Sequence, residues 1–160
     1  MKTTSLRPPR GLSRLLFRLP IWLYRLGLGW VLGKRFLLLN HTGRRSGRVR
    51  QTVLEVAGHD EEMDTYLVAA GFGPQSDWYR NLLKTPEVMI QVGRRRLPVV
   101  AVPLSPAESG EAMVDYARRH PMAVQGLLRV LGFTADSEAD YRKLGQEAVP
   151  FVAFRQSDWL

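Results

Sequence analysis

The stretch Leu37–Leu54, LLLNHTGRRSGRVRQTVL, decides how this chain folds. An apolar run ends at a polar turn, and an alternating apolar and polar run begins after the glycine-bracketed segment Gly43–Gly47. This pattern predicts two strands joined by a basic loop. Glycine allows backbone angles that other residues resist, so the amide groups of the loop can turn inward together. The stretch therefore predicts an anion-binding loop between two strands.

Four arginines belong to this loop and to the start of the second strand: Arg44, Arg45, Arg48 and Arg50. Guanidinium groups form paired hydrogen bonds with phosphates and carboxylates. Arg48 and Arg50 are two residues apart, so in a strand they are expected on the same face. The arginines support an anion site and leave the identity of the anion open.

The composition favours one globular domain. The 160 residues are 45% hydrophobic and 24% charged, which is enough apolar material for a core. Cysteine is absent, which excludes disulfides, thiolate metal sites and cysteine nucleophiles. The histidines His41, His59 and His120 show no zinc-ligand spacing, so no metal site is expected.

Positive charge is concentrated near the N-terminus. The net charge is +8, and 12 of the 23 Lys and Arg residues precede Glu55, which is the first acidic residue. We expect a basic amphipathic helical segment over residues 1–34 and a folded domain over residues 35–160. In the first segment, five arginines fall on one stripe of a helix whose remaining surface is apolar. They are Arg7, Arg10, Arg14, Arg18 and Arg25.

The arginines interrupt this segment too often for a membrane-spanning helix, which needs about 20 apolar residues, or for a signal peptide. An interfacial helix on an anionic membrane surface fits the pattern, with Trp22 and Trp30 at headgroup depth. Two alternatives stay open, namely packing on its own domain and contact with another subunit. Nucleic-acid binding is not favoured, because a broad apolar face adjoins the arginines and no recognition module follows.

Beyond the loop, short strands at hairpin spacing are followed by helices. Further strands are predicted at residues 51–58, 65–70, 88–92, 97–102 and 149–154. Helices are predicted at residues 78–84, 106–120, 121–131 and 137–144. Ser76 is a predicted N-cap, and Ser105 and Glu108 form a capping-box pattern. This order predicts an α+β fold, a small antiparallel barrel with flanking helices.

Three segments, in this order and at this spacing, resemble the deazaflavin-dependent nitroreductase family, which includes quinone reductases that use the coenzyme F420. They are Thr42–Arg50 (TGRRSGRVR), Ala70–Leu82 (AGFGPQSDWYRNL) and Pro86–Gly93 (PEVMIQVG). The resemblance implies a split β-barrel like that of FMN-binding proteins. It also implies a cytoplasmic enzyme that passes hydride from reduced F420 to a quinone or a nitro compound.

The same resemblance suggests site residues. Arg44 and Arg50 match the family's phosphate-contacting arginines, and Trp78 matches a tryptophan near the deazaflavin ring. The full set of expected cofactor-binding residues is Gly43, Arg44, Arg45, Ser46, Gly47, Arg50, Ala70, Gly71, Trp78 and Tyr79. His120 stands where prodrug-activating members have a tyrosine, which makes it a candidate proton donor and favours a quinone over a bulky nitro compound.

A second functional class stays open. Relatives with this barrel bind FMN, lipids or tetrapyrroles, and a non-catalytic subunit of a membrane-surface complex would keep both the barrel and the N-terminal helix. For the enzyme we expect F420 as the cofactor, with FMN as the alternative. We also expect a peripheral position on the inner face of the cell membrane and, by analogy with similar barrels, a homodimer.

Overall fold

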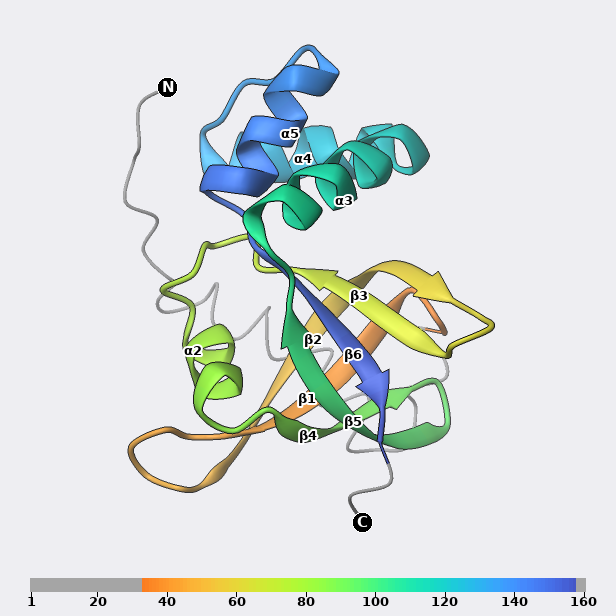
Figure 1. Cartoon of the computed structure of the whole chain (residues 1–160), viewed down its shortest axis with the longest axis vertical. Helices are drawn as coiled ribbons and strands as arrows, with labels where there is room; N and C mark the ends of the chain where they lie inside the picture. Colours follow the sequence, from red (N-terminus) through yellow and green to blue (C-terminus); the bar gives the residue numbers. More distant parts are fainter. Residues whose placement is uncertain (1–32, 158–160) are drawn as a thin grey trace.

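Six strands close into an antiparallel barrel in the computed structural model, which describes residues 33–157 (Figure 1). The strands are β1 (Phe36–Thr42), β2 (Val49–Asp60), β3 (Thr65–Ala69), β4 (Glu87–Val92), β5 (Arg95–Pro103) and β6 (Phe151–Gln156). Around the barrel their order is β1-β2-β3-β6-β5-β4. The predicted antiparallel barrel with flanking helices is confirmed.

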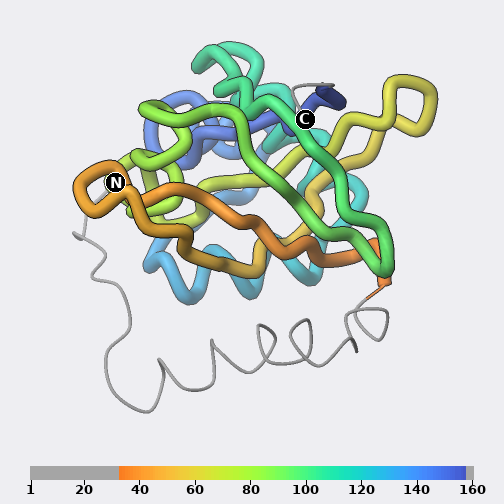
Figure 2. Tube along the Cα trace, turned by 90° about the horizontal axis from the view of Figure 1, so that it is seen from below, coloured from red at the N-terminus to blue at the C-terminus, as the bar shows by residue number. Residues whose placement is uncertain are grey.

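The helices lie in two places. The short helix α2 (Asp77–Lys84) lies beside the barrel, near the loop between β1 and β2. Helices α3 (Pro106–Arg119), α4 (Pro121–Leu131) and α5 (Glu138–Glu147) gather at one end of the molecule. Figure 2 shows the β1–β2 loop, in orange, projecting from the edge of the barrel. This loop and α2 lie next to each other beside the barrel.

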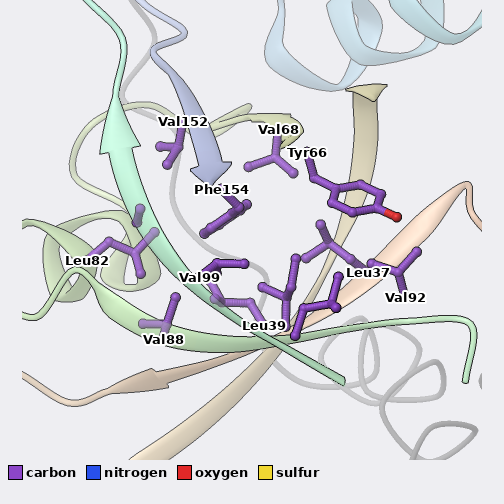
Figure 3. Packing of buried hydrophobic residues seen from close by; sticks show 13 residues of the cluster. Leu37, Leu39, Tyr66, Val68, Leu82, Val88, Val92, Val99, Val152 and Phe154 are labelled. Carbon is purple, nitrogen blue, oxygen red and sulfur yellow. The ribbon is translucent and has the colours of Figure 1, made fainter. Parts of the chain in front are cut away.

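Apolar side chains fill the interior of the barrel (Figure 3). Leu37 and Leu39 alternate along β1 and are fully buried, as expected for residues on the inner face of a strand. They belong to a cluster with side chains from the other strands, including Tyr66 and Phe154. Leu82 of α2 belongs to the same cluster. The helix is therefore anchored in the barrel core, which fixes its position beside the β1–β2 loop.

A second core lies between the three gathered helices and the outer face of the barrel. It contains Ala57 of β2 and Phe151 of β6, together with buried residues of α3, α4 and α5. Where α3 crosses α5, a Cβ added to Gly145 would lie 2.8 Å from the Cα of Gly110, so this crossing depends on small residues.

Two local expectations differ from the structure. Ser76 occupies the N-cap position of α2 but makes no capping hydrogen bond. Its hydroxyl donates instead to the Gly73 carbonyl at 2.9 Å, which closes the preceding turn. The strand predicted to end at residue 58 continues to Asp60, and the ring of His59 stacks on that of Tyr66 with centroids 4.1 Å apart.

The predicted N-terminal helix lies almost wholly outside the described residues, since they begin at residue 33. Within residues 33–157, none of the helices has both the length and the apolar character that crossing a bilayer requires.

Candidate functional site

The loop between β1 and β2 is closed by its own hydrogen bonds. The Gly43 amide donates to the Arg48 carbonyl at 2.8 Å, and the Gly47 amide donates to the Gly43 carbonyl at 2.9 Å. Gly47 has a φ of +69°, in the left-handed region that favours glycine. At Gly43, an added Cβ would lie 2.6 Å from Ser46 Oγ. The tight turn therefore favours glycine at position 47, and a side chain at position 43 would displace the Ser46 hydroxyl.

Helix α2 holds the loop from the side. The Lys84 ammonium donates to the Arg44 carbonyl at 2.7 Å, and the Arg44 amide donates to the side-chain oxygen of Asn81 at 3.1 Å. Residues almost 40 positions apart in the sequence are thereby joined. The loop and the helix form one structural unit at the end of the barrel.

A pocket of about 260 Å³ opens between the loop and α2. Its lining residues are Gly43, Arg44, Arg45, Ser46, Arg50, Asp77 and Asn81. The lining contains three arginines and one carboxylate, so the net charge of the pocket is positive. Sites that enclose a whole small molecule usually measure about 300–1,000 Å³. The pocket is thus suited to one anionic group, such as a phosphate, at the end of a longer ligand.

Arg44 is oriented by two side chains of α2. Its guanidinium donates to Asp77 Oδ1 from both terminal nitrogens at 3.2 Å, and one of these nitrogens also donates to Asn81 Oδ1 at 3.0 Å. These bonds use three of the five N–H groups of the guanidinium. Arg44 is held against the helix and keeps two N–H groups for a ligand.

His41 lies behind the pocket, where β1 ends. It pairs with Arg50 in the β1–β2 ladder, and its Nδ1 lies 2.9 Å from the side-chain nitrogen of Asn81. The pKa of His41 is lowered from 6.5 to about 4, mainly by burial and also by the positive charge of Arg50, while Asp77 opposes the shift. The imidazole is neutral at physiological pH.

The structure brings together the expected loop residues. Gly43, Arg44, Arg45, Ser46 and Arg50 all line the pocket, and Gly47 closes the turn without lining it. Their part in binding a cofactor stays a prediction.

The other expected cofactor residues lie outside the pocket lining. The Ala70 amide donates to the Pro150 carbonyl at 2.8 Å. Gly71 lies against α4, where an added Cβ would be 3.2 Å from Leu127. Trp78 and Tyr79 are half-buried on α2, pack against the barrel core and meet edge to face with ring centroids 6.0 Å apart.

His120, the candidate proton donor, lies at the exposed junction of α3 and α4. Its ring lies 5.4 Å from that of Tyr116, measured between centroids, and it does not line the pocket described above. Its role in proton donation stays a prediction.

Sequence reasoning missed three residues of this site: His41, Asp77 and Asn81. Asp77 and Asn81 are four residues apart on α2, a spacing that places both on the helix face toward the loop. His41 continues the alternation of Leu37 and Leu39, which marks it as an inward-facing residue. Both signals are present in the sequence, but neither identifies the partner across the fold.

Comparisons with known proteins show the family and the fold of the chain. Residues 19–124 match the model of the family described as F420H(2)-dependent quinone reductase. An F420H(2)-dependent quinone reductase of Mycobacterium tuberculosis strain H37Rv is 40% identical over 85 residues, which are 51% of this chain and 52% of that protein. The aligned part of the chain thus spans about half the length of this relative.

Two solved structures are similar at low sequence identity. An F420-H2 dependent reductase gives a TM-score of 0.53 at 20% identity, covering 77% of this chain and 96% of that one. A protein described as a domain-swapped dimer gives a TM-score of 0.55 at 19% identity, covering 91% of this chain and 100% of that one. These likenesses show the fold alone.

Proposed function

Because the chain belongs to the F420H(2)-dependent quinone reductase family, we propose that it is an oxidoreductase that binds reduced coenzyme F420 and reduces a quinone. The observation that carries the proposal is the basic pocket between the β1–β2 loop and α2. The family match includes the whole of this pocket, since its lining residues run from Gly43 to Asn81.

The residues of the pocket fit an anionic part of this coenzyme. F420 carries a phosphodiester and a polyglutamate tail, all anionic, on a flat aromatic ring. Gly43 has no side chain, and an added Cβ there would crowd Ser46. The inner surface of the loop therefore stays open as a cradle for a ligand. Arg45 and Arg50 line that cradle and supply positive charge, and Arg44 keeps two N–H groups for a ligand. We propose that this donor set holds the phosphate.

The protein's own share in the reaction is binding and orientation. When bound, the reduced deazaflavin supplies the hydride that a quinone accepts. Trp78 is a half-buried aromatic residue of α2, and we propose that it contributes to the binding of the ring. Ala70, Gly71 and Tyr79 are proposed to border the same ligand further from the phosphate.

The acceptor is proposed to be a quinone or another apolar molecule, taken up at the inner face of the cell membrane. The apolar and basic character of residues 1–34 supports this position, because such segments favour anionic lipid surfaces. A nitro-type acceptor is the second proposal. A homodimer is also proposed, and one protein of similar fold is described as a domain-swapped dimer.

A titration with oxidised F420, followed by its fluorescence, tests the cofactor, with FMN titrated in parallel. Tight binding of F420 in preference to FMN supports the proposal. A preference for FMN would keep the oxidoreductase but change its electron source. Binding of neither flavin would favour the alternative, a non-catalytic subunit at a membrane surface.

Arg50→Ala tests the pocket itself. Loss of a charge-assisted contact is expected to weaken F420 binding by about 2 kcal/mol, or roughly thirtyfold. The matched control is Arg129→Ala, an exposed arginine on α4 at the other end of the molecule (Figure 1). Equal affinity of the two variants would place the anionic group elsewhere.

A further inference from the structure

Asn81 lies where the barrel, the pocket loop and α2 meet, and its side chain is 2% exposed. Its carboxamide oxygen accepts from the backbone amide and the guanidinium of Arg44. Its nitrogen faces the imidazole of His41, which is 5% exposed. A buried amide with all these partners fixes the relative position of three elements.

The chemistry of the partners determines the orientation of the amide. Both groups of Arg44 are donors, so the oxygen of Asn81 faces them and its NH₂ group faces His41. Because an NH₂ group only donates, Nδ1 of His41 has to accept. His41 is therefore neutral, with its proton on Nε2.

We propose that Asn81 and the neutral imidazole of His41 are positioning residues for the anion pocket. The imidazole fixes the carboxamide, and the carboxamide fixes Arg44 together with the loop. The proposal deepens the proposed function and rests on it. In this assignment His41, and Asn81 at the wall of the pocket, both act through Arg44.

The charged groups around His41 fit this assignment. Arg50 of β2 opposes a positive charge on the imidazole, while Asp77 of α2 favours it. Protonation would place an Nδ1–H group against the NH₂ group of Asn81, so two donors would face each other. The hydrogen bonds that run from His41 through Asn81 to Arg44 therefore require the neutral form of the imidazole.

Nitrogen-15 NMR of the full chain tests this tautomer without any ligand. The expected result is an Nε2–H tautomer of His41 from about pH 5 to pH 8. An Nδ1–H tautomer, or an imidazolium near pH 7, would overturn the proposal.

Variants of both residues test the positioning role by F420 titration. Asn81→Asp keeps acceptors for Arg44 but offers no donor to Nδ1, so His41 has to carry a proton on Nδ1, as the other tautomer or as the imidazolium, to stay hydrogen-bonded. In this variant nitrogen-15 NMR should show a proton on Nδ1 of His41 at pH 8, and Asn81→Leu, which has neither acceptor nor donor, should bind F420 about tenfold more weakly than wild type. His41→Asn keeps an acceptor near the position of Nδ1 and should stay within about threefold of wild type.

The outcomes separate this inference from the proposed function. An Nε2–H tautomer of His41 that persists in Asn81→Asp, or wild-type affinity in Asn81→Leu, would show that Asn81 does not act through His41. If the wild-type chain binds no F420, the proposed function fails. The tautomer measurement still decides the hydrogen-bond chain, and inorganic phosphate, followed by the amide shifts of the loop, then replaces F420 as the probe.

Discussion

At the scale of single residues, His41 makes the stability of the fold depend on pH. Its pKa is lowered from 6.5 to about 4, mainly by burial. Between these values the unfolded chain binds a proton that the native protein does not, so the free energy of unfolding falls as the pH drops from about 6.5 to about 4. The full shift corresponds to about 3 kcal/mol. Urea unfolding, followed by tryptophan fluorescence at several pH values, measures this loss.

The control for this prediction is His41→Asn, which does not titrate. Its free energy of unfolding should change less than that of wild type over the same pH range, because the other titratable groups are unchanged. Equal slopes for both proteins would mean that another group carries the dependence.

The residues of the pocket could be predicted from sequence only in part. Gly43, Arg44 and Arg50 belong to one stretch whose glycines and arginines indicate an anion-binding loop. His41, Asp77 and Asn81 act through partners that the fold brings near, such as the ladder pairing of His41 with Arg50. Local pattern indicates which face a residue occupies, and it does not indicate which residue lies opposite.

At the scale of elements, the crossing of α3 and α5 depends on Gly145. A Cβ at this position would lie 2.8 Å from the Cα of Gly110 and closer still to the backbone of Ser109, and neither can move alone. Gly145→Ala should therefore separate the helices and lower the free energy of unfolding by about 2 kcal/mol. Thermal unfolding followed by circular dichroism measures the change.

Gly126→Ala is the matched control for this crossing. Gly126 lies in α4 and is exposed, and an added Cβ would meet nothing within 4 Å. The higher helix propensity of alanine should raise the free energy of unfolding by up to about 1 kcal/mol. A gain in stability for both variants would show that α3 and α5 do not pack tightly at Gly145.

Helices and strands were predictable from sequence where a hydrophobic periodicity or a helix-start residue is clear. The alternation at the start of β2 and the proline at the start of α3 indicate their elements directly. The anchoring of α2 in the barrel through Leu82 and the close approach at Gly145 were not predictable, because both depend on the partner surface. Ser76 shows the same limit, since its hydroxyl prefers the carbonyl of the preceding turn.

At the scale of the whole molecule, the barrel is complete within the described residues. All six strands lie between Phe36 and Gln156, and β6 closes the barrel between β3 and β5. The sequence predicts an antiparallel barrel but not the strand order, which places the last strand between two earlier ones. Just before β1, the Arg35 carbonyl accepts from the Val56 amide at 2.8 Å. A chain that begins at residue 33 keeps this bond and all six strands.

Deletion of residues 1–32 therefore separates the proposed membrane role from the proposed reaction. These residues carry apolar and basic side chains without acidic ones, so the full chain is expected to sediment with anionic liposomes, less so as salt rises. The shortened chain should stay in solution and still reduce a water-soluble quinone with reduced F420. Sedimentation of the shortened chain would place lipid binding on the barrel. A shortened chain that no longer folds would instead indicate that the segment packs on its own domain, because removing a packed helix exposes the apolar surface beneath it.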